Sequence, residues 1–160
     1  MAKERIPSTG AIRLLKQHKV SFTPRPYRYQ EKGGTKVSAR ELQVDEHQVI
    51  KTLVMEDEKQ QGLIILMHGD KEVSLKNLAR QLDVKQITPC PPAKADRLTG
   101  YQTGGISPFG TRQAIPVYME KGILDLEKIY INGGKRGFLI EIKPQDMLTV
   151  LKPQIVEVGI

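Results

Sequence analysis

Apolar residues recur at two spacings along the chain, and the spacing separates predicted strands from predicted helices. Short aliphatic and β-branched runs, bounded by charged residues or by Gly and Pro, are typical of strands. The charged and polar segment DEKQQG separates the first two runs and favours a hairpin. The pattern predicts strands at 50–56, 63–68, 85–88, 115–120, 128–132, 138–142 and 155–158. A further extended segment is predicted at 22–30, where Pro24 and Pro26 favour the edge of a sheet.

Helical spacing appears between these runs. Ser8 or Thr9 is suited to cap a helix over 11–18, and the capping-box pattern Ser38-x-x-Glu41 predicts a short helix over 38–44. A turn of helix is expected after Asp45. Further short helices are predicted at 75–82, 93–98 and 144–151.

Strand hairpins interleaved with short helices predict an α+β fold. A chain of 160 residues is suited to one domain with one core, so we expect a single domain over 1–160. The expected architecture is a curved, barrel-like sheet that is mixed but largely antiparallel. It should have about six or seven strands, flanked by short helices.

Composition narrows the class of protein. Hydrophobic residues make up 39% and aromatic residues 5%, so the core must be aliphatic. No apolar run is long enough to span a bilayer, and MAKERIPSTG lacks the apolar segment of a secretory signal. The expected location is the cytoplasm, without a membrane partner. His18, His47, His68 and the single cysteine, Cys90, lack the spacing of metal ligands, so neither a metal nor another cofactor is expected.

The net charge of +7 and the pI near 9.5 indicate a polyanionic partner. Lysines and arginines are spread along the chain without a block of like charge. If nucleic acid binds, a folded face of the protein must therefore hold it.

Two glycine-rich segments carry the strongest functional signal. They are TGYQTGGISPFG at 99–110 and YINGGKRG at 130–137. Glycine pairs occur where the backbone takes positive φ or comes into contact with a ligand. The two segments predict a pocket walled by main-chain groups, although each pair alone is also typical of a tight turn.

Lys51 is a candidate for chemistry because it lies just inside a strongly apolar strand. On the pocket side it would be partly desolvated and would hold a substrate oxygen or a phosphate. The alternative is a lysine at a strand start whose ammonium group reaches water, and this strand alone slightly favours that alternative.

The motifs VIKTLVM, GYQTGGISPFGTRQAIPVY and IYINGGKRGFLIEI, in this order and spacing, resemble the YbaK/EbsC family of aminoacyl-tRNA deacylases. These proteins are free-standing relatives of the editing domain inserted in bacterial prolyl-tRNA synthetases. The resemblance covers about residues 12–151. It implies an ester hydrolase that acts on the aminoacylated 3′ end of tRNA, with Cys-tRNA(Pro) as the first candidate substrate and prolyl-tRNA synthetase as a candidate partner.

The resemblance also implies roles for residues of this chain. The catalytic set would be Lys51, Gly104 and Gly105. The substrate-binding set would be Tyr27, Thr52, Ile106, Ser107, Pro108, Asn132, Gly133 and Gly134. From their position beside the second glycine pair, Lys135 and Arg136 are expected to bind tRNA phosphates, with Arg97 and Arg112 as further candidates.

The sequence leaves open both the amino acid that is removed and the class of function. Asn132 stands where family members commonly carry Ser, and Phe138-Leu139 stand where the cysteine-specific branch has an acidic residue. The amino acid removed is therefore open, and Ala-tRNA(Pro) is an alternative substrate. A non-catalytic module that binds tRNA or a synthetase is a second alternative. A domain that binds a small molecule is a third.

Overall fold

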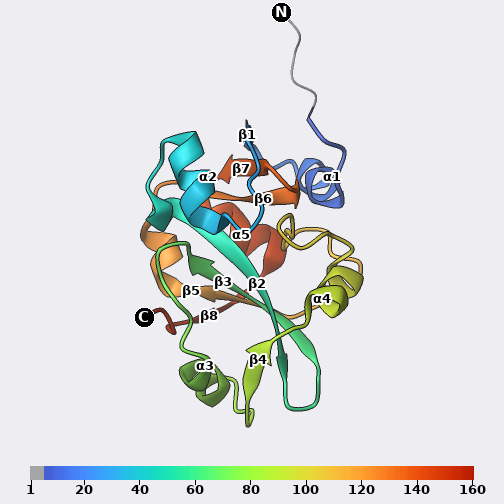
Figure 1. Ribbon diagram of the computed structural model, residues 1–160, viewed down its shortest axis with the longest axis vertical. Coiled ribbons are helices and arrows are strands. Elements are labelled where there is room, and N and C mark those ends of the chain that lie inside the picture. The colour runs from blue at the N-terminus through green and yellow to red at the C-terminus, as the bar shows by residue number, and fades with distance from the viewer. Residues whose placement is uncertain (1–5) are drawn as a thin grey trace, which may run out of the picture.

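The computed structural model describes residues 6–160 and arranges eight strands in one mixed sheet. The strand order is β1-β7-β6-β2-β3-β5-β8, and β4 pairs with β2 beside this path (Figure 1). Four strand pairings are antiparallel and three are parallel. The path has two free edges, so within these residues the sheet is open. The α+β class and the mixed, mainly antiparallel sheet are confirmed, and the sheet has eight strands where about six or seven were expected.

The seven strands other than β2 are each shorter than β2. Their bounds are β1 Thr23–Pro26, β3 Gly62–His68, β4 Ile87–Pro89, β5 Val117–Glu120, β6 Ile129–Lys135, β7 Phe138–Ile142 and β8 Gln154–Val156. The sequence located every strand, and the observed ends differ by a few residues.

Strand β2, Val49–Asp57, is the centre of the sheet because three strands pair with it. Strand β3 pairs along its length, while β6 pairs only at Val49 and Ile50 and β4 only at the last three residues. The Gly69 N–H donates to the Val49 carbonyl at 2.7 Å, so odd-numbered residues of β2 direct their main-chain groups toward β3. The N–H and C=O of Thr52 therefore point to the other edge, in a gap between β6 and β4. We call this gap the seam.

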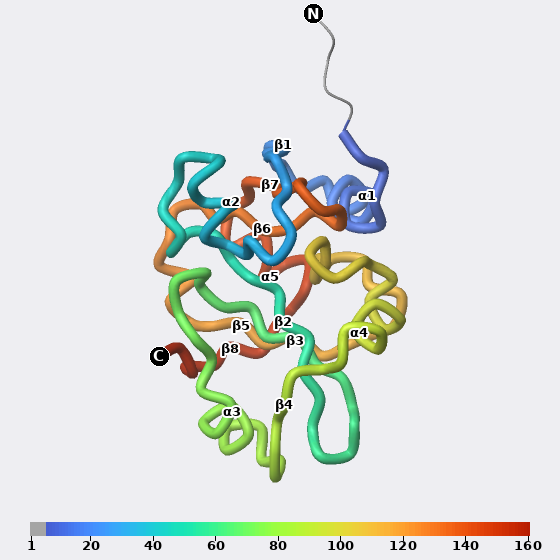
Figure 2. The backbone as a smooth tube through the Cα atoms, in the orientation of Figure 1, coloured from blue at the N-terminus to red at the C-terminus, as the bar shows by residue number. Residues whose placement is uncertain are grey.

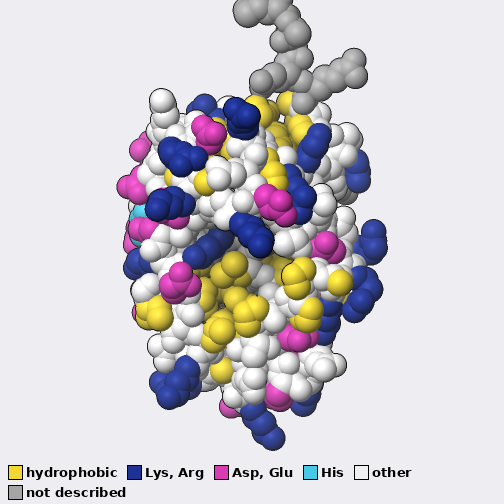
Figure 3. Space-filling model, in the orientation of Figure 1, with side chains coloured by type: hydrophobic (Ala, Val, Ile, Leu, Met, Phe, Trp, Pro, Cys, Tyr) yellow, Lys and Arg dark blue, Asp and Glu magenta, His cyan; other side chains and the backbone are white. Residues whose placement is uncertain are grey.

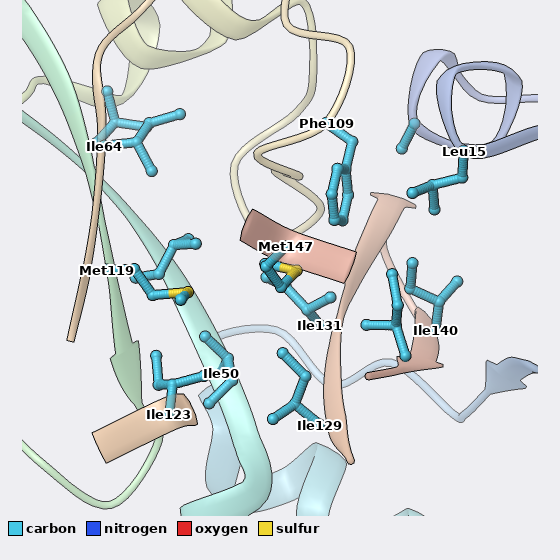
Figure 4. Packing of buried hydrophobic residues seen from close by; sticks show 14 of the residues in the cluster. Leu15, Ile50, Ile64, Phe109, Met119, Ile123, Ile129, Ile131, Ile140 and Met147 are labelled. Carbon is cyan, nitrogen blue, oxygen red and sulfur yellow. The ribbon is translucent and has the colours of Figure 1, made fainter. Parts of the chain in front are cut away.

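Helices cover the sheet and close a mostly aliphatic core. They are α1 Gly10–Gln17, α2 Gly34–Leu42, α3 Leu75–Gln81, α4 Pro92–Thr99 and α5 Pro144–Leu151, with short 3-10 turns at Glu46–Gln48 and Lys121–Asp125. The Thr9 hydroxyl caps α1 by accepting the Ile12 N–H, as the sequence predicts. Phe109 and Met147 lie fully buried among isoleucines of the strands (Figure 4). None of the helices in residues 6–160 has the length and apolar character needed to cross a membrane.

The expected start of the second helix at Ser38 is wrong. Helix α2 begins four residues earlier, after Gly33, and Ser38 lies buried within it. The Ser38 hydroxyl donates to the Thr35 carbonyl at 3.1 Å, inside the helix. A serine hydroxyl bonds local carbonyls as readily as it caps a helix, so the capping-box sequence is also compatible with a position inside a helix.

Glu120 ties the end of the chain to the sheet. Its buried carboxylate accepts the Val158 N–H at 2.7 Å and the Gly159 N–H at 2.9 Å. A carboxylate that accepts two main-chain donors holds them without a bridging water.

Glu120→Ala is expected to lower the free energy of unfolding by about 2–3 kcal/mol, because two main-chain donors lose a charged acceptor. Urea unfolding would show a lower midpoint at an unchanged slope. Glu157→Ala is the control, since its side chain is 68% exposed and its ion pair with Lys121 lies at the surface. That variant should stay within about 0.5 kcal/mol of the wild type. Equal losses in the two variants would contradict the role of Glu120.

Candidate functional site

A cleft of about 780 Å³ opens over β2, between α2, α4 and the segment before α3. Figure 3 shows an apolar floor in this face with Lys and Arg side chains directly beside it. Leu53 and Met55 of β2, Val73, Leu75 and Pro89 contribute the apolar lining. The cleft is large enough for a ligand that combines an apolar part with an anionic part.

Lys51 lines the cleft from the third residue of β2 and is partly buried. Its ammonium nitrogen lies 3.5 Å from the Gly69 carbonyl oxygen, a long contact for a hydrogen bond. Residues 6–160 offer it no carboxylate within ion-pair distance. Lys51 is therefore a cation at the cleft whose charge is not neutralised by a neighbour.

The first glycine loop reaches the cleft through Thr103, Gly104 and Ile106. The Thr103 hydroxyl donates to Asp96 of α4 at 2.6 Å, and the Gly105 N–H donates to the Gln102 carbonyl at 2.8 Å. Gly104 has φ +93°, which residues with a side chain rarely adopt. The loop is thus held from within and from α4.

The second glycine loop holds the first one from the opposite side. The Arg136 Nε donates to the Thr103 carbonyl at 2.9 Å, and the Asn132 amide donates to the Gly104 carbonyl at 3.4 Å. The Arg136 guanidinium also stacks over the Tyr29 ring, 5.2 Å from its centroid. In Figure 2 the segment after α4 runs close to the end of β6, in agreement with these contacts.

Gly105 allows the two loops to touch. A Cβ at this position would lie 2.6 Å from the Arg136 nitrogen and 2.8 Å from the Lys135 carbonyl carbon. Both are backbone atoms, which cannot move aside as a flexible side chain can. Gly105 is buried and does not line the cleft, and its N–H is already bonded.

Several predicted substrate contacts lie behind the cleft wall. Ser107 and Pro108 are buried, and the Ser107 hydroxyl accepts the Phe109 N–H at 3.2 Å. The Gly133 carbonyl accepts a hydrogen bond from Thr9 at 2.6 Å, while the Gly134 N–H donates to the Asn132 side chain at 2.7 Å. None of these four residues lines the cleft.

Tyr27, Thr52 and Asn132 do line the cleft. Burial raises the pKa of the Tyr27 hydroxyl, so it stays protonated near neutral pH. The Thr52 hydroxyl is the one buried side-chain polar atom without a hydrogen-bond partner in residues 6–160. Thr52 therefore brings to the seam a hydroxyl without a partner and main-chain groups that lie outside the registers of β6 and β4.

The predicted phosphate ligands separate into two groups. Arg136 lines the cleft and is engaged by the first glycine loop. Lys135, Arg97 and Arg112 are exposed outside the lining, where their side chains face solvent.

The sequence did not place every lining residue in the site, and Tyr29, Thr103 and Cys90 are among those it left out. Neither Tyr29 nor Thr103 belongs to a local pattern that marks a site, because each acts through a distant partner. Burial raises the pKa of the Cys90 thiol, which disfavours a reactive thiolate. In the described part of the chain, no three His, Cys, Asp or Glu side chains are grouped as they would be to hold a metal ion.

Comparison with known proteins places this site in a family. Residues 32–150 match the family described as "Aminoacyl-tRNA editing domain". A protein of Enterococcus faecalis named "Putative Cys-tRNA(Pro)/Cys-tRNA(Cys) deacylase EbsC" is 29% identical over 160 residues, covering 99% of this chain and 98% of that protein.

One further relative and one solved structure extend the comparison. A proline–tRNA ligase of Lactobacillus helveticus is 23% identical over 105 residues, which cover 64% of this chain and 18% of the ligase. A crystal structure described as "a putative trans-editing enzyme for prolyl tRNA synthetase" has a TM-score of 0.81 and 21% identity. It covers 97% of this chain and 99% of its own, so the two share a fold.

Gly105→Ala is expected to lower the free energy of unfolding by about 1–3 kcal/mol, because the new methyl group overlaps backbone atoms of the second loop. Hydrogen exchange at the residue 105 amide should accelerate as its bond to Gln102 loosens.

Gly34→Ala is a suitable control, since no atom lies within 4 Å of the added Cβ and its φ is +61°. It should cost about 1–2 kcal/mol through backbone conformation and leave exchange at residue 105 unchanged. Slow exchange at residue 105 in Gly105→Ala would show that the loops do not need this contact.

Proposed function

This chain belongs to the family of aminoacyl-tRNA editing domains, and we propose that it is a free-standing deacylase that hydrolyses mischarged aminoacyl-tRNA. The observation that carries the proposal is one cleft that joins the Lys51 ammonium group to the main chain at Gly104. We further propose that residues 1–160 form one editing domain. The relative from Enterococcus faecalis supports this, since it matches 99% of this chain.

The reaction adds water to the ester that links an amino acid to the terminal ribose of tRNA. Water oxygen bonds to the ester carbonyl carbon, and the bond from that carbon to the ribose oxygen breaks. The ribose oxygen keeps the electron pair and receives a proton, so the products are a free amino acid and tRNA with its hydroxyl restored. The transition state places negative charge on the carbonyl oxygen, which fixed donors stabilise strongly.

Lys51 supplies positive charge where that negative charge develops or at the ribose oxygens beside it. Its ammonium group lines the cleft, and its contact with Gly69 is long. A substrate oxygen can therefore replace this contact at small cost. A charged donor in a partly buried cleft binds an oxygen atom more strongly than the same donor in water.

The chain's own nucleophiles are poor candidates for a covalent step. The Cys90 thiol has a raised pKa because it is buried, and the buried Ser107 hydroxyl caps the Phe109 N–H. Direct attack by water, assisted by groups of the substrate, suits such a site better than an acyl-enzyme.

The relatives guide the choice of substrate. One is named a deacylase of Cys-tRNA(Pro) and Cys-tRNA(Cys), and another is a proline–tRNA ligase. We therefore propose Cys-tRNA(Pro) as the first substrate, with Ala-tRNA(Pro) as the alternative and prolyl-tRNA synthetase as a candidate partner. The cytoplasm, where tRNA is charged, is the expected location.

The net charge of +7 fits a polyanionic substrate. We propose that Lys135, Arg97 and Arg112 contact acceptor-stem phosphates outside the cleft, since all three are exposed.

The deciding experiment is a deacylation panel with Cys-, Ala-, Ser- and Pro-tRNA(Pro), together with Cys-tRNA(Cys). Release of one amino acid well above its spontaneous rate supports a deacylase and identifies the substrate. Tight tRNA binding with no hydrolysis of any substrate would instead support a binding module.

Lys51→Ala is expected to lower kcat/KM for the best substrate at least a hundredfold, because the transition state loses a charged contact worth a few kcal/mol. Lys51→Met retains the aliphatic stem and should lose a similar factor, which separates charge from packing. Unfolding midpoints of both variants should stay near that of the wild type. Full activity in a folded Lys51→Met protein would mean that Lys51 is an ordinary strand residue.

A further inference from the structure

We propose that Arg136 is a positioning residue for hydrolysis, which acts through the peptide between Thr103 and Gly104 rather than through tRNA phosphates. The inference rests on the proposed deacylase function. It assigns to the Gly104 N–H the role of donor to the ester carbonyl oxygen as negative charge develops there.

The geometry of the peptide group links Arg136 to this donor. In a trans peptide the C=O and the N–H point in opposite directions. The Arg136 Nε donates to the Thr103 carbonyl at 2.9 Å, so the Gly104 N–H of the same peptide points away from the guanidinium. This N–H has no acceptor in residues 6–160, and Gly104 lines the cleft.

The adjoining peptide shows why Gly104, and not Gly105, is the available donor. The Gly104 carbonyl accepts from Asn132, and the Gly105 N–H donates to the Gln102 carbonyl. Both polar groups of that peptide are therefore bonded within the protein. Of the two glycine N–H groups, only that of Gly104 is left for a ligand.

Charge strengthens the link. A hydrogen bond from a charged guanidinium polarises the peptide that accepts it, which makes the N–H of the same peptide a better donor. The guanidinium is itself held by stacking over Tyr29, and the Thr103 side chain is fixed by Asp96. A donor held from several sides does not need to reorganise during the reaction.

Two substitutions of similar length separate positioning from phosphate binding. Gln carries an amide nitrogen on Cδ, the same position as the Arg Nε, so Arg136→Gln keeps the donor and removes the charge. Arg136→Met keeps the length and removes both. The substrates are full-length aminoacyl-tRNA and a minimal aminoacyl-adenosine ester that has no phosphates.

With the wild type active, Arg136→Met is expected to lower kcat at least tenfold on both substrates, because a misplaced donor costs much of its stabilisation. Arg136→Gln should retain kcat within about threefold. KM for tRNA and its dependence on salt should change little in either variant. Lys135→Gln serves as the comparison for a phosphate contact, with a higher KM for tRNA and a salt slope smaller by about one.

The proposal is overturned if Arg136→Gln and Arg136→Met behave alike, with a raised KM for tRNA, a reduced salt slope and normal hydrolysis of the minimal ester. It is also overturned if Arg136→Met retains full kcat on both substrates.

Hydrogen exchange measured by NMR tests the anchoring of the first glycine loop by Arg136 independently of the proposed function. Exchange at the Gly105 amide should accelerate in Arg136→Met and stay slow in Arg136→Gln. Unchanged exchange in Arg136→Met would refute the anchoring, whether or not the wild type is active. A wild type that hydrolyses no substrate, but shows the expected exchange, would refute the deacylase function alone. Unfolding midpoints of both variants establish that each is folded.

Discussion

The contact between the two glycine loops is the constraint on which the site depends. Gly105 lies so close to the backbone at Lys135 and Arg136 that no side chain fits between them. This approach brings Arg136 and Asn132 within reach of the carbonyls of Thr103 and Gly104. Segments about thirty residues apart in the chain thus form one rigid wall. A wall fixed in this way presents main-chain donors to a substrate without loops that must order on binding.

The second element of the site is the interrupted pairing of β2. This strand pairs with β6 at its start and with β4 at its end, which leaves the seam at Thr52. Lys51 is adjacent to the seam and is held in register by β3, opposite Met67. The sheet therefore supplies both a rigid base for the lysine and polar main-chain groups beside it. Rigid strands hold such groups more accurately than a flexible loop does.

The sequence predicted the strands well because aliphatic runs between charged turns have few alternative structures. It also drew attention to Lys51 and to both glycine loops. It did not predict what the glycines do, because a glycine pair has the same letters whether it meets a ligand or another backbone. Gly105 belongs to the second case. Arg136 and Tyr29 form a pair only after folding, so local patterns carry no signal for their stacking. The sequence could not place Ser38 correctly, because a serine hydroxyl bonds main-chain groups both at a helix cap and inside a helix.

The seam also bears on solubility. Unpaired main-chain groups at the rim of a sheet invite pairing with another molecule, which is a common route to aggregation. Here the unpaired stretch is about one residue long and lies between two bonded neighbours, β6 and β4. A foreign strand needs several consecutive groups to attach, and this opening is too short to offer them. The protein can thus keep unpaired main-chain N–H and C=O groups available to a small ligand while excluding another polypeptide. At one of the two free edges of the sheet, β1 carries Pro24 and Pro26, which lack the N–H that an incoming strand requires.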